Sequence, residues 1–222
     1  MLKGKISPSM MCADIYDLAN TLKIFEKENI EYLHIDVMDG EFVPNFMLSD
    51  GIAKQYRKVT NIPLDYHLMV INPLDKIDYF DLHEGDLMAI HLESTDKIEE
   101  CLDKIHSKGA KAGLAIKPAT SVNELIPYLD LIDFVLVMTV NPGFAGQALV
   151  KETLDKINKT RELLDKHHKE DIMIEVDGNV SFVNAKIMRE RGADIFVAGT
   201  SSVFKNDLSL KEGIGRLREA IK

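Results

Sequence analysis

Residues 32–40 read YLHIDVMDG, a short apolar run that turns polar at its end. Two other apolar runs end in the same way, at His67 in LDYHLMV and at Asp177 in IEVDGNV. His34 and Asp36 are two residues apart, so on an extended strand their side chains project from the same face. The fold therefore decides the chemistry: these side chains meet only if the three runs are strands of one parallel sheet.

Short apolar runs alternate with amphipathic stretches about eight times along the chain. The predicted strands are Lys5–Ser9, Tyr32–Val37, Leu64–Val70, Leu87–His91, Ala112–Ile116, Phe134–Thr139, Met173–Asp177 and Ile195–Ala198. The predicted helices are Ile15–Glu28, Pro73–Phe80, Asp96–His106, Val122–Leu129, Lys151–Lys166, Phe182–Arg191 and Leu210–Ile221. Alternating units of this kind predict parallel strands joined by right-handed crossovers.

Eight such units in 222 residues favour an α/β fold of one domain, residues 1–222, that forms a compact (β/α)8 TIM barrel. An open doubly wound sheet is the alternative, although SPSMMCAD stands where a Gly-rich dinucleotide fingerprint would follow the first strand. In a barrel, the carboxyl ends of all strands meet at one end, where active sites lie.

Composition narrows the functional classes. A net charge of −9 argues against nucleic acid or an anionic membrane as a partner. Cys12 and Cys101 are too few for a disulfide framework, which favours free thiols in a reducing compartment. The apolar content of residues 1–12 is too short and broken for a signal peptide, and no apolar run reaches the roughly 18 residues of a membrane span. We therefore expect a cytoplasmic protein.

Four strand-end residues form a candidate metal site: His34, Asp36, His67 and Asp177. The chain has seven histidines, and any one of them alone is more often structural than a ligand. His91 also ends a strand, so position alone does not discriminate. Two imidazoles and two carboxylates together suit one divalent metal (Zn²⁺, Mn²⁺, Fe²⁺ or Co²⁺), and the sequence does not choose among them.

Two carboxylates beside one metal favour proton transfer at the carbon next to a carbonyl. In that reaction the metal stabilises an enediolate, and Asp36 and Asp177 act on opposite faces to invert one stereocentre. The alternative is that both are only metal ligands or loop caps. Three methionines near the strand ends are core residues or form a dry wall around the enediolate: Met38, Met69 and Met138.

Three Gly-bearing loops follow the last three predicted strands. They are residues 141–147 (NPGFAGQ), Gly178, and Gly199 with Thr200 and Ser201. Glycines let backbone N–H groups face an anion, and the loops after the last barrel strands commonly bind phosphate. The sequence therefore predicts a phosphate site at these three loops.

At these residues the chain resembles the ribulose-phosphate 3-epimerase family. The matching segments are SPSMMCAD, HIDVMDGEFVPN, LDYHLMVINP, VMTVNPGFAGQ, IEVDGN and VAGTS. The resemblance implies a TIM barrel of the ribulose-phosphate-binding type, a metal-dependent isomerase that epimerises C3 of a ketose phosphate, and a homo-oligomer (dimer or hexamer). It implies a metal held by His34, Asp36, His67 and Asp177, with Asp36 and Asp177 as the catalytic acid/base pair. It also implies substrate contacts, with the sugar at the first two residues and mostly with the phosphate at the rest: Ser9, His67, Gly143, Phe144, Ala145, Gly146, Gly178, Asn179, Gly199, Thr200 and Ser201.

Departures from the family pattern refine the expected substrate. Members that act on ribulose 5-phosphate usually read GFGGQ, VDGG and AGS, whereas this chain has Ala145, Asn179 and Thr200 followed by serine. With Met11 and Cys12, these loops look like the branch that acts on D-allulose 6-phosphate, forming D-fructose 6-phosphate. The alternative is interconversion of D-ribulose 5-phosphate and D-xylulose 5-phosphate. Lys117 stands where the family tends to carry Asn, and the sequence gives no account of it.

Two other functional classes share this type of fold. Phosphate-binding barrels that decarboxylate orotidine or gulonate phosphates carry D-x-K-x-x-D on an early strand. In Asp36-Val37-Met38-Asp39 a methionine replaces that lysine, which argues against a lyase. A non-catalytic sugar-phosphate-binding barrel is the remaining alternative, because fold alone does not fix function.

Overall fold

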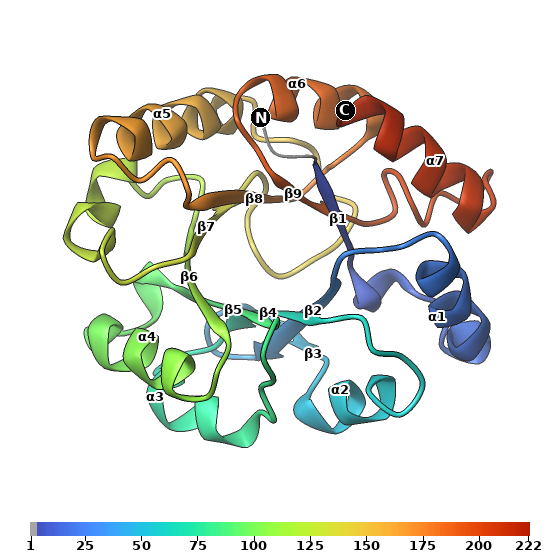
Figure 1. Cartoon of the computed structure of the whole chain (residues 1–222), viewed down its shortest axis with the longest axis horizontal. Helices are drawn as coiled ribbons and strands as arrows, with labels where there is room; N and C mark the ends of the chain where they lie inside the picture. The colour runs from blue at the N-terminus through green and yellow to red at the C-terminus, as the bar shows by residue number, and fades with distance from the viewer. Residues whose placement is uncertain (1–3) are drawn as a thin grey trace.

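Eight parallel strands close into a barrel in the computed structural model, which describes residues 4–222 (Figure 1). The strands are β1 (Lys5–Pro8), β2 (Leu33–Asp39), β4 (Leu64–Met69), β5 (Leu87–His91), β6 (Lys111–Ile116), β7 (Phe134–Met138), β8 (Met173–Asp177) and β9 (Ile195–Ala198). Their order is β1-β9-β8-β7-β6-β5-β4-β2, and a parallel bridge from Ser9 to His34 joins β1 to β2. The predicted barrel is thereby confirmed.

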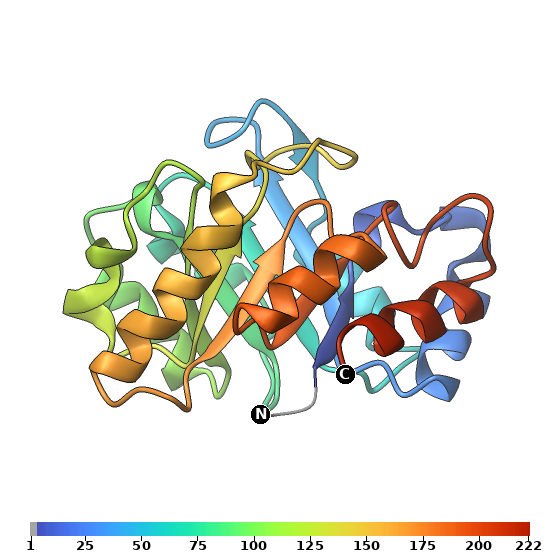
Figure 2. The same cartoon turned by 90° about the horizontal axis from the view of Figure 1, so that it is seen from above.

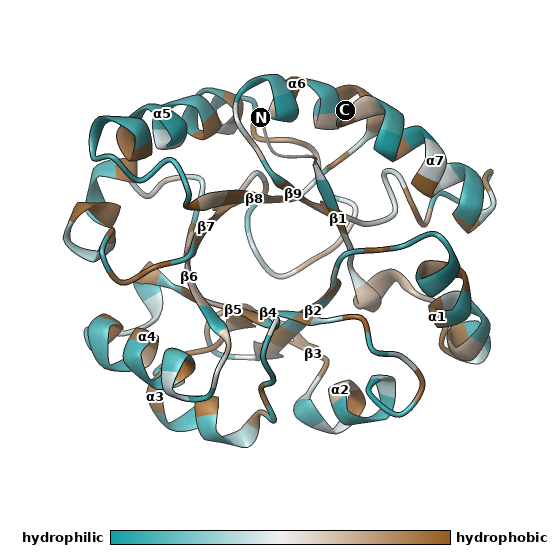
Figure 3. Cartoon of the chain, in the orientation of Figure 1, coloured by the Kyte–Doolittle hydropathy of each residue, from teal (hydrophilic) through white to brown (hydrophobic). Residues whose placement is uncertain are grey.

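Helices surround the barrel and bury their apolar stripes against it. They are α1 (Leu18–Lys27), α2 (Asp50–Tyr56), α3 (Pro73–Lys76), α4 (Ile98–Ser107), α5 (Glu152–Lys166), α6 (Phe182–Glu190) and α7 (Leu210–Ala220). Figure 3 shows the strands mostly hydrophobic and the helices mixed, with hydrophilic stretches along their outer sides. Within residues 4–222, none of these helices has the length and apolar character that a membrane crossing requires.

The structure departs from the predicted elements mainly in residues 40–63. A two-residue strand, β3 (Phe46–Met47), pairs antiparallel with the end of β2, and α2 follows it. Neither was predicted, because Gly, Pro and Asn interrupt this stretch and α2 is too short to show a helical apolar stripe. The predicted helix Val122–Leu129 is instead a 3₁₀ helix, η5 (Val122–Tyr128), with a capping box at Ser121 and Pro127 inside it.

Strand register places the predicted site residues at one level. In the β2–β4 ladder Asp36 lies opposite His67, and His34 lies opposite Asp65. At the carboxyl end of the strands, the loop after β2 and the loop after β7 project from the same end of the barrel (Figure 2). The side chain of Asn45 donates a hydrogen bond of 2.8 Å to the carbonyl of Gly143, which ties these two loops together.

At the opposite end of the barrel, one bonding pattern recurs on every second strand. A carboxylate that lies just before the next strand accepts a hydrogen bond of 2.8–3.0 Å from a backbone N–H near the start of the strand. The four pairs are Ile6 with Glu31, Leu64 with Asp86, Ala112 with Asp133, and Ile174 with Asp194. A cationic or imidazole side chain also bonds each acid: Arg218, Arg57, His106 and Arg161 respectively. These four anchors fix the strand starts.

Candidate metal centre and active site

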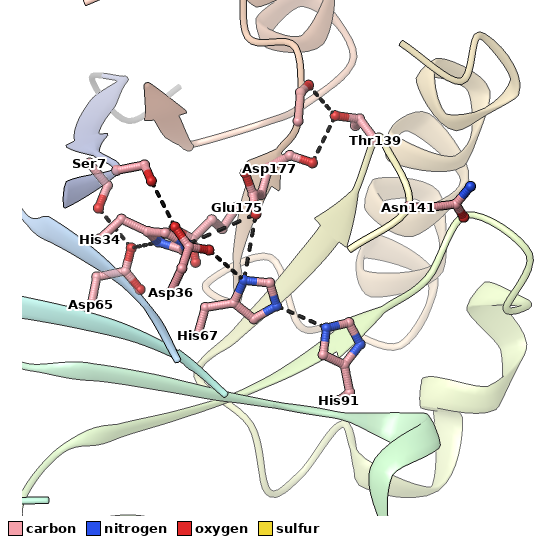
Figure 4. Close-up of polar contacts among 12 residues, drawn as sticks. Ser7, His34, Asp36, Asp65, His67, His91, Thr139, Asn141, Glu175 and Asp177 are labelled. Carbon is pink, nitrogen blue, oxygen red and sulfur yellow. Dashed lines mark hydrogen bonds and ion pairs between the residues drawn. The ribbon is translucent and has the colours of Figure 1, made fainter. Parts of the chain in front are cut away.

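Four side chains from three strands converge inside the carboxyl end of the barrel: His34, Asp36, His67 and Asp177, here called the His–Asp cluster (Figure 4). Asp36 Oδ1 lies 3.4 Å from His34 Nε2 and 3.5 Å from His67 Nδ1. Asp177 Oδ2 lies 3.9 Å from His34 Nε2 and 3.5 Å from His67 Nδ1. The structure thus brings together the four residues that the sequence selected; their roles as ligands stay a prediction.

The His–Asp cluster suits a divalent cation. His34 Nε2 and His67 Nδ1 are buried and lack a hydrogen-bond partner, although both face the two carboxylates. An unpaired buried nitrogen is costly unless something binds it, and two such nitrogens beside two carboxylate oxygens form a set of four donors. Burial lowers the pKa of His34, but the charges of Asp65 and Asp36 raise it more, so it lies well above its ordinary value. The cluster therefore favours positive charge at its centre.

His34 is held from below by buried acids. Its Nδ1 lies 2.7 Å from Asp65 Oδ2, which also accepts a 2.7 Å hydrogen bond from the Ser7 hydroxyl. Glu175 is fully buried, with one oxygen 3.7 Å from His34 Nδ1. Burial and the charge of Asp65 raise the pKa of Glu175 well above its ordinary value. An Asp65 carboxylate at Nδ1 leaves Nε2 free to face the cluster.

His67 is held from the side by another imidazole. Its Nε2 lies 2.9 Å from Nε2 of His91, whose Nδ1 lies 3.1 Å from Glu93 Oε2 (Figure 4 shows the first contact). Burial lowers the pKa of His91 to about 4, so His91 is neutral at pH 7. Burial raises the pKa of Glu93, but hydrogen bonds from His91 and Thr120 outweigh it and hold that pKa at about 2. His67 is thus held by His91, which is held in turn by the carboxylate of Glu93 at the rim of the barrel.

A cavity opens above the His–Asp cluster. Asp36 and Asp177 line it, together with all the predicted substrate-binding residues except His67: Ser9, Gly143, Phe144, Ala145, Gly146, Gly178, Asn179, Gly199, Thr200 and Ser201. His67 is fully buried beneath the cavity, and its predicted contact with the sugar stays a prediction. The three predicted methionines also line the cavity while remaining buried: Met38, Met69 and Met138.

The loops around the cavity are ordered by side-chain hydrogen bonds to the backbone. Gln147 donates to the carbonyls of Asn141 and Phe144, and Asn179 donates a 2.7 Å bond to the carbonyl of Gln147. Gly178 has φ +117°, and a Cβ there would lie 2.6 Å from a methyl carbon of Val140. Glycine is therefore required at the turn that follows Asp177.

Several supporting residues were missed from the sequence: Asp65, Glu175, Glu93 and Asn45. Three of them carry a signal in retrospect, because each acid lies two residues from a strand-end residue already noted. Asp65 precedes His67, Glu175 precedes Asp177, and Glu93 follows His91, which was itself set aside as uninformative. Asn45 lies in an irregular loop and shows no comparable pattern.

The arrangement is equipped for proton transfer at a bound substrate. Ser9 donates a 2.7 Å hydrogen bond to Asp36 Oδ2, which leaves Oδ1 facing the centre of the cluster. Asp36 and Asp177 come from strands three steps apart around the barrel and both reach the cavity. Two carboxylates that approach one cavity from different strands can serve as acid and base to the same molecule.

Solved structures of other enzymes share the fold. The 3-keto-L-gulonate-6-phosphate decarboxylase from Vibrio cholerae O1 biovar El Tor is 12% identical, covers 99% of this chain and 98% of its own, and superposes with a TM-score of 0.70. A 3-hexulose-6-phosphate synthase is 13% identical, with complete coverage of both chains and a TM-score of 0.66. At these identities the likeness concerns the barrel alone.

Sequence relatives are much closer. The family described as "Ribulose-phosphate 3 epimerase family" matches residues 5–204. A ribulose-phosphate 3-epimerase of Bacillus subtilis (strain 168) is 38% identical over 214 residues, which cover 96% of this chain and 98% of the relative. The chloroplastic ribulose-5-phosphate-3-epimerase of Arabidopsis thaliana is 37% identical over 201 residues, 90% of this chain and 71% of the relative. The chain therefore belongs to the ribulose-phosphate 3 epimerase family and is an isomerase, a ketose-phosphate 3-epimerase.

Proposed function

We propose that this enzyme interconverts D-ribulose 5-phosphate and D-xylulose 5-phosphate by inverting C3, with one divalent metal held by the His–Asp cluster. The observation that carries the proposal is the convergence of two carboxylates and two unpaired imidazole nitrogens at the base of one cavity. The names of the relatives support the five-carbon substrate. The identity of the metal (Zn²⁺, Mn²⁺, Fe²⁺ or Co²⁺) is left to measurement.

The two aspartates perform the proton transfers. One carboxylate of the pair Asp36 and Asp177 removes the proton from C3, and the electron pair of the broken C–H bond moves toward the C2 carbonyl to form an enediolate. The other carboxylate returns a proton to the opposite face of C3, which inverts the stereocentre. A metal held by the His–Asp cluster would supply positive charge that stabilises the enediolate. Ser9 keeps Asp36 in a fixed rotamer through the transfer.

The methionines and the glycine loops complete the site. Met38, Met69 and Met138 give the cavity an apolar wall that keeps water from the enediolate. The backbone N–H groups around Gly143–Gly146, Gly178 and Gly199 would receive the phosphate, because an acidic protein must bind that anion through local dipoles rather than net charge.

The expected preference for D-allulose 6-phosphate gains no support from the relatives, which are named ribulose-phosphate 3-epimerases. One of its three markers has a structural role instead: the Asn179 side chain bonds the carbonyl of Gln147, so the loop itself uses it. The six-carbon substrate remains a second candidate on the strength of Ala145 and Thr200, which line the cavity. The homo-oligomer (dimer or hexamer) and the cytoplasmic location stay predictions.

The test is kcat/KM for D-ribulose 5-phosphate and D-allulose 6-phosphate, measured on protein loaded in turn with each of the four metals. A preference for the pentulose phosphate of tenfold or more would support the proposal. A preference for the hexulose phosphate would restore the loop residues as specificity markers. Failure with both substrates, by folded and metal-loaded protein, would favour the non-catalytic barrel.

A further inference from the structure

A line of polar groups leads from the His–Asp cluster to the rim of the barrel. His67 contacts His91 at 2.9 Å, and His91 contacts Glu93 Oε2 at 3.1 Å. The other oxygen, Oε1, accepts a 2.9 Å hydrogen bond from the backbone N–H of Lys117 and a further one from the Thr120 hydroxyl. Both imidazoles are fully buried, so no water competes for these contacts.

The direction of each hydrogen bond along this line follows from its outer end. An ionised carboxylate only accepts, so Glu93 requires the proton of His91 to sit on Nδ1. His91 Nε2 is then a lone pair, and at 2.9 Å it accepts the N–H of His67 Nε2. A neutral His67 that donates from Nε2 has a bare Nδ1, the atom that faces Asp36 and Asp177.

We propose that Glu93 is a positioning residue that acts through His91 to fix the tautomer of His67, so that the Nδ1 of His67 is presented to the metal. The inference rests on the proposed function in assuming that the His–Asp cluster binds a metal. It assigns roles to His91 and Glu93. It also gives the backbone N–H of Lys117 a role, holding Glu93 in place, that does not depend on the Lys117 side chain. Supporting partners of metal-bound histidines are commonly worth 10–100-fold in metal affinity.

The substitution Glu93→Gln tests the tautomer directly, because the surroundings dictate how the amide must lie. The backbone N–H of Lys117 can only donate a hydrogen bond. The amide oxygen of the introduced glutamine must therefore occupy the position of Glu93 Oε1. The amide NH₂ then faces His91 Nδ1, which must become an acceptor. His91 Nε2 becomes a donor, and His67 must carry its proton on Nδ1, where it blocks the metal.

Two measurements follow, and the first already tests the inference on the parent protein. Histidine ¹⁵N NMR at pH 8–9 reads which nitrogen carries the proton: we expect His91 protonated on Nδ1 in the parent protein, with and without Zn²⁺, and on Nε2 in metal-free Glu93→Gln. The second is the affinity for Zn²⁺, measured by competition with a chromophoric chelator, with the visible spectrum of bound Co²⁺ as a check on ligand geometry. We expect Glu93→Gln to weaken Zn²⁺ binding by about 10–100-fold.

The matched control is Glu41→Gln, which removes one charge from an exposed side chain at the same end of the barrel and should leave Zn²⁺ affinity within about twofold of the parent, as an exposed surface change does. A parent His91 protonated on Nε2 would overturn the inference. So would a folded Glu93→Gln protein that binds Zn²⁺ as tightly as the parent. If the parent itself bound neither Zn²⁺ nor Co²⁺, the metal-dependent function would fail. If the tautomers and affinities behaved as expected but no epimerisation occurred, the positioning role would stand and the proposed reaction would not.

Discussion

The inside of the barrel has two unlike walls. The wall formed by β1, β2, β4 and β8 is polar: Ser7, Ser9, His34, Asp36, Asp65, His67, Glu175 and Asp177. The wall formed by β5, β6 and β7 is apolar apart from His91 at the end of β5: Leu87, Ala89, Ala115, Phe134, Leu136 and Met138. Both walls are built by the same alternation of side chains along parallel strands, and both are buried.

The proposed chemistry and the packing are thus divided between the two walls. The polar wall carries nitrogen and oxygen atoms that lack partners, such as those of His34, His67 and Glu175, and a buried unpaired atom costs stability. The apolar wall contributes burial without any such cost, and it keeps the dielectric around the carboxylates low. Substitutions on the polar wall should therefore change activity more than stability, and those on the apolar wall the reverse.

The largest expected effect is on the polar wall. Asp36→Asn removes the negative charge and the proton-transfer ability of one member of the carboxylate pair while keeping its shape and the hydrogen bond from Ser9. We expect kcat to fall by at least about 10³-fold, since general acid–base groups contribute about 10²–10⁴-fold and a metal ligand is weakened as well. Steady-state kinetics and a thermal melt would measure both consequences.

Asp177→Asn is the companion variant, because it changes the same charge on β8 rather than β2. A loss of similar size in both variants, with the melting temperature nearly unchanged, would support the paired mechanism. Turnover near the parent level in either one would show that a single carboxylate suffices.

The apolar wall should respond in the opposite way. Leu136→Ala leaves a cavity beside Phe134 and Met138, and we expect it to lower the free energy of unfolding by about 2–5 kcal/mol. Leu136→Met conserves volume and should cost less than about 1.5 kcal/mol. Urea denaturation would measure the difference, and kcat of the molecules that remain folded should stay within a few-fold of the parent. A collapse of kcat in folded Leu136→Ala would show that the walls are not separable.

A smaller effect concerns the loop that closes over the polar wall. Asp39 accepts hydrogen bonds from the backbone N–H groups of Phe42 and Ile71 and from the ammonium of Lys76. Burial raises the pKa of Asp39, but these bonds outweigh it and hold the pKa well below its ordinary value. The native state therefore binds fewer protons than the unfolded state below about pH 4.

It follows that the stability contributed by Asp39 is present above about pH 4 and is lost as the pH falls further. At pH 7 the parent should exceed Asp39→Asn in free energy of unfolding by about 1–3 kcal/mol, the range for hydrogen bonds to a charged group. The gap should shrink below pH 4 in a series of denaturation curves. A gap that stayed constant from pH 7 to pH 3 would contradict the assignment.

The smallest expected effect is at a loop residue that the sequence had marked for substrate choice. Asn179 has φ +47°, a conformation that glycine adopts freely, and its side chain bonds the loop rather than a strand. We expect Asn179→Gly to change the ratio of kcat/KM for the pentulose and hexulose phosphates by less than about fivefold, or about 1 kcal/mol. A larger shift toward the pentulose phosphate would make Asn179 a specificity residue after all.

The barrel and the convergence of the His–Asp cluster could be predicted from the sequence because both follow from periodicity. Eight buried runs require parallel strands, and parallel strands bring their carboxyl ends together, so His34, Asp36, His67 and Asp177 were bound to be neighbours. The residues that hold these four side chains in place could not be predicted in the same way. Whether His91 contacts His67 depends on side-chain rotamers across two strands, which no pattern of apolar residues encodes.

Residues 40–63 were the other region whose structure the sequence did not predict. The short elements β3 and α2 are stabilised by tertiary contacts rather than by local propensity, since Met47 packs against Met38 and Met69, and Ala53 and Tyr56 join the main core. Local signals are weakest where packing decides the conformation. The bond from Asn45 to Gly143, nearly a hundred residues away in the chain, belongs to the same class of interaction.

The four anchors at the far end of the barrel bear on how the chain reaches this fold. Each joins two groups only 20–25 residues apart, within one consecutive pair of strands, so each closes a quarter of the barrel with contacts that are local in the chain. The printed sequence shows no matching internal repeat, yet the bonding repeats four times. We expect native-state hydrogen exchange to show that the barrel opens in units of two strands. A pair of strands that keeps its own anchor can stay folded while the adjacent pair unfolds. In kinetic terms the barrel would form from four locally closed units, with the pairing of β1 and β9, the strands most distant in the chain, as the last step.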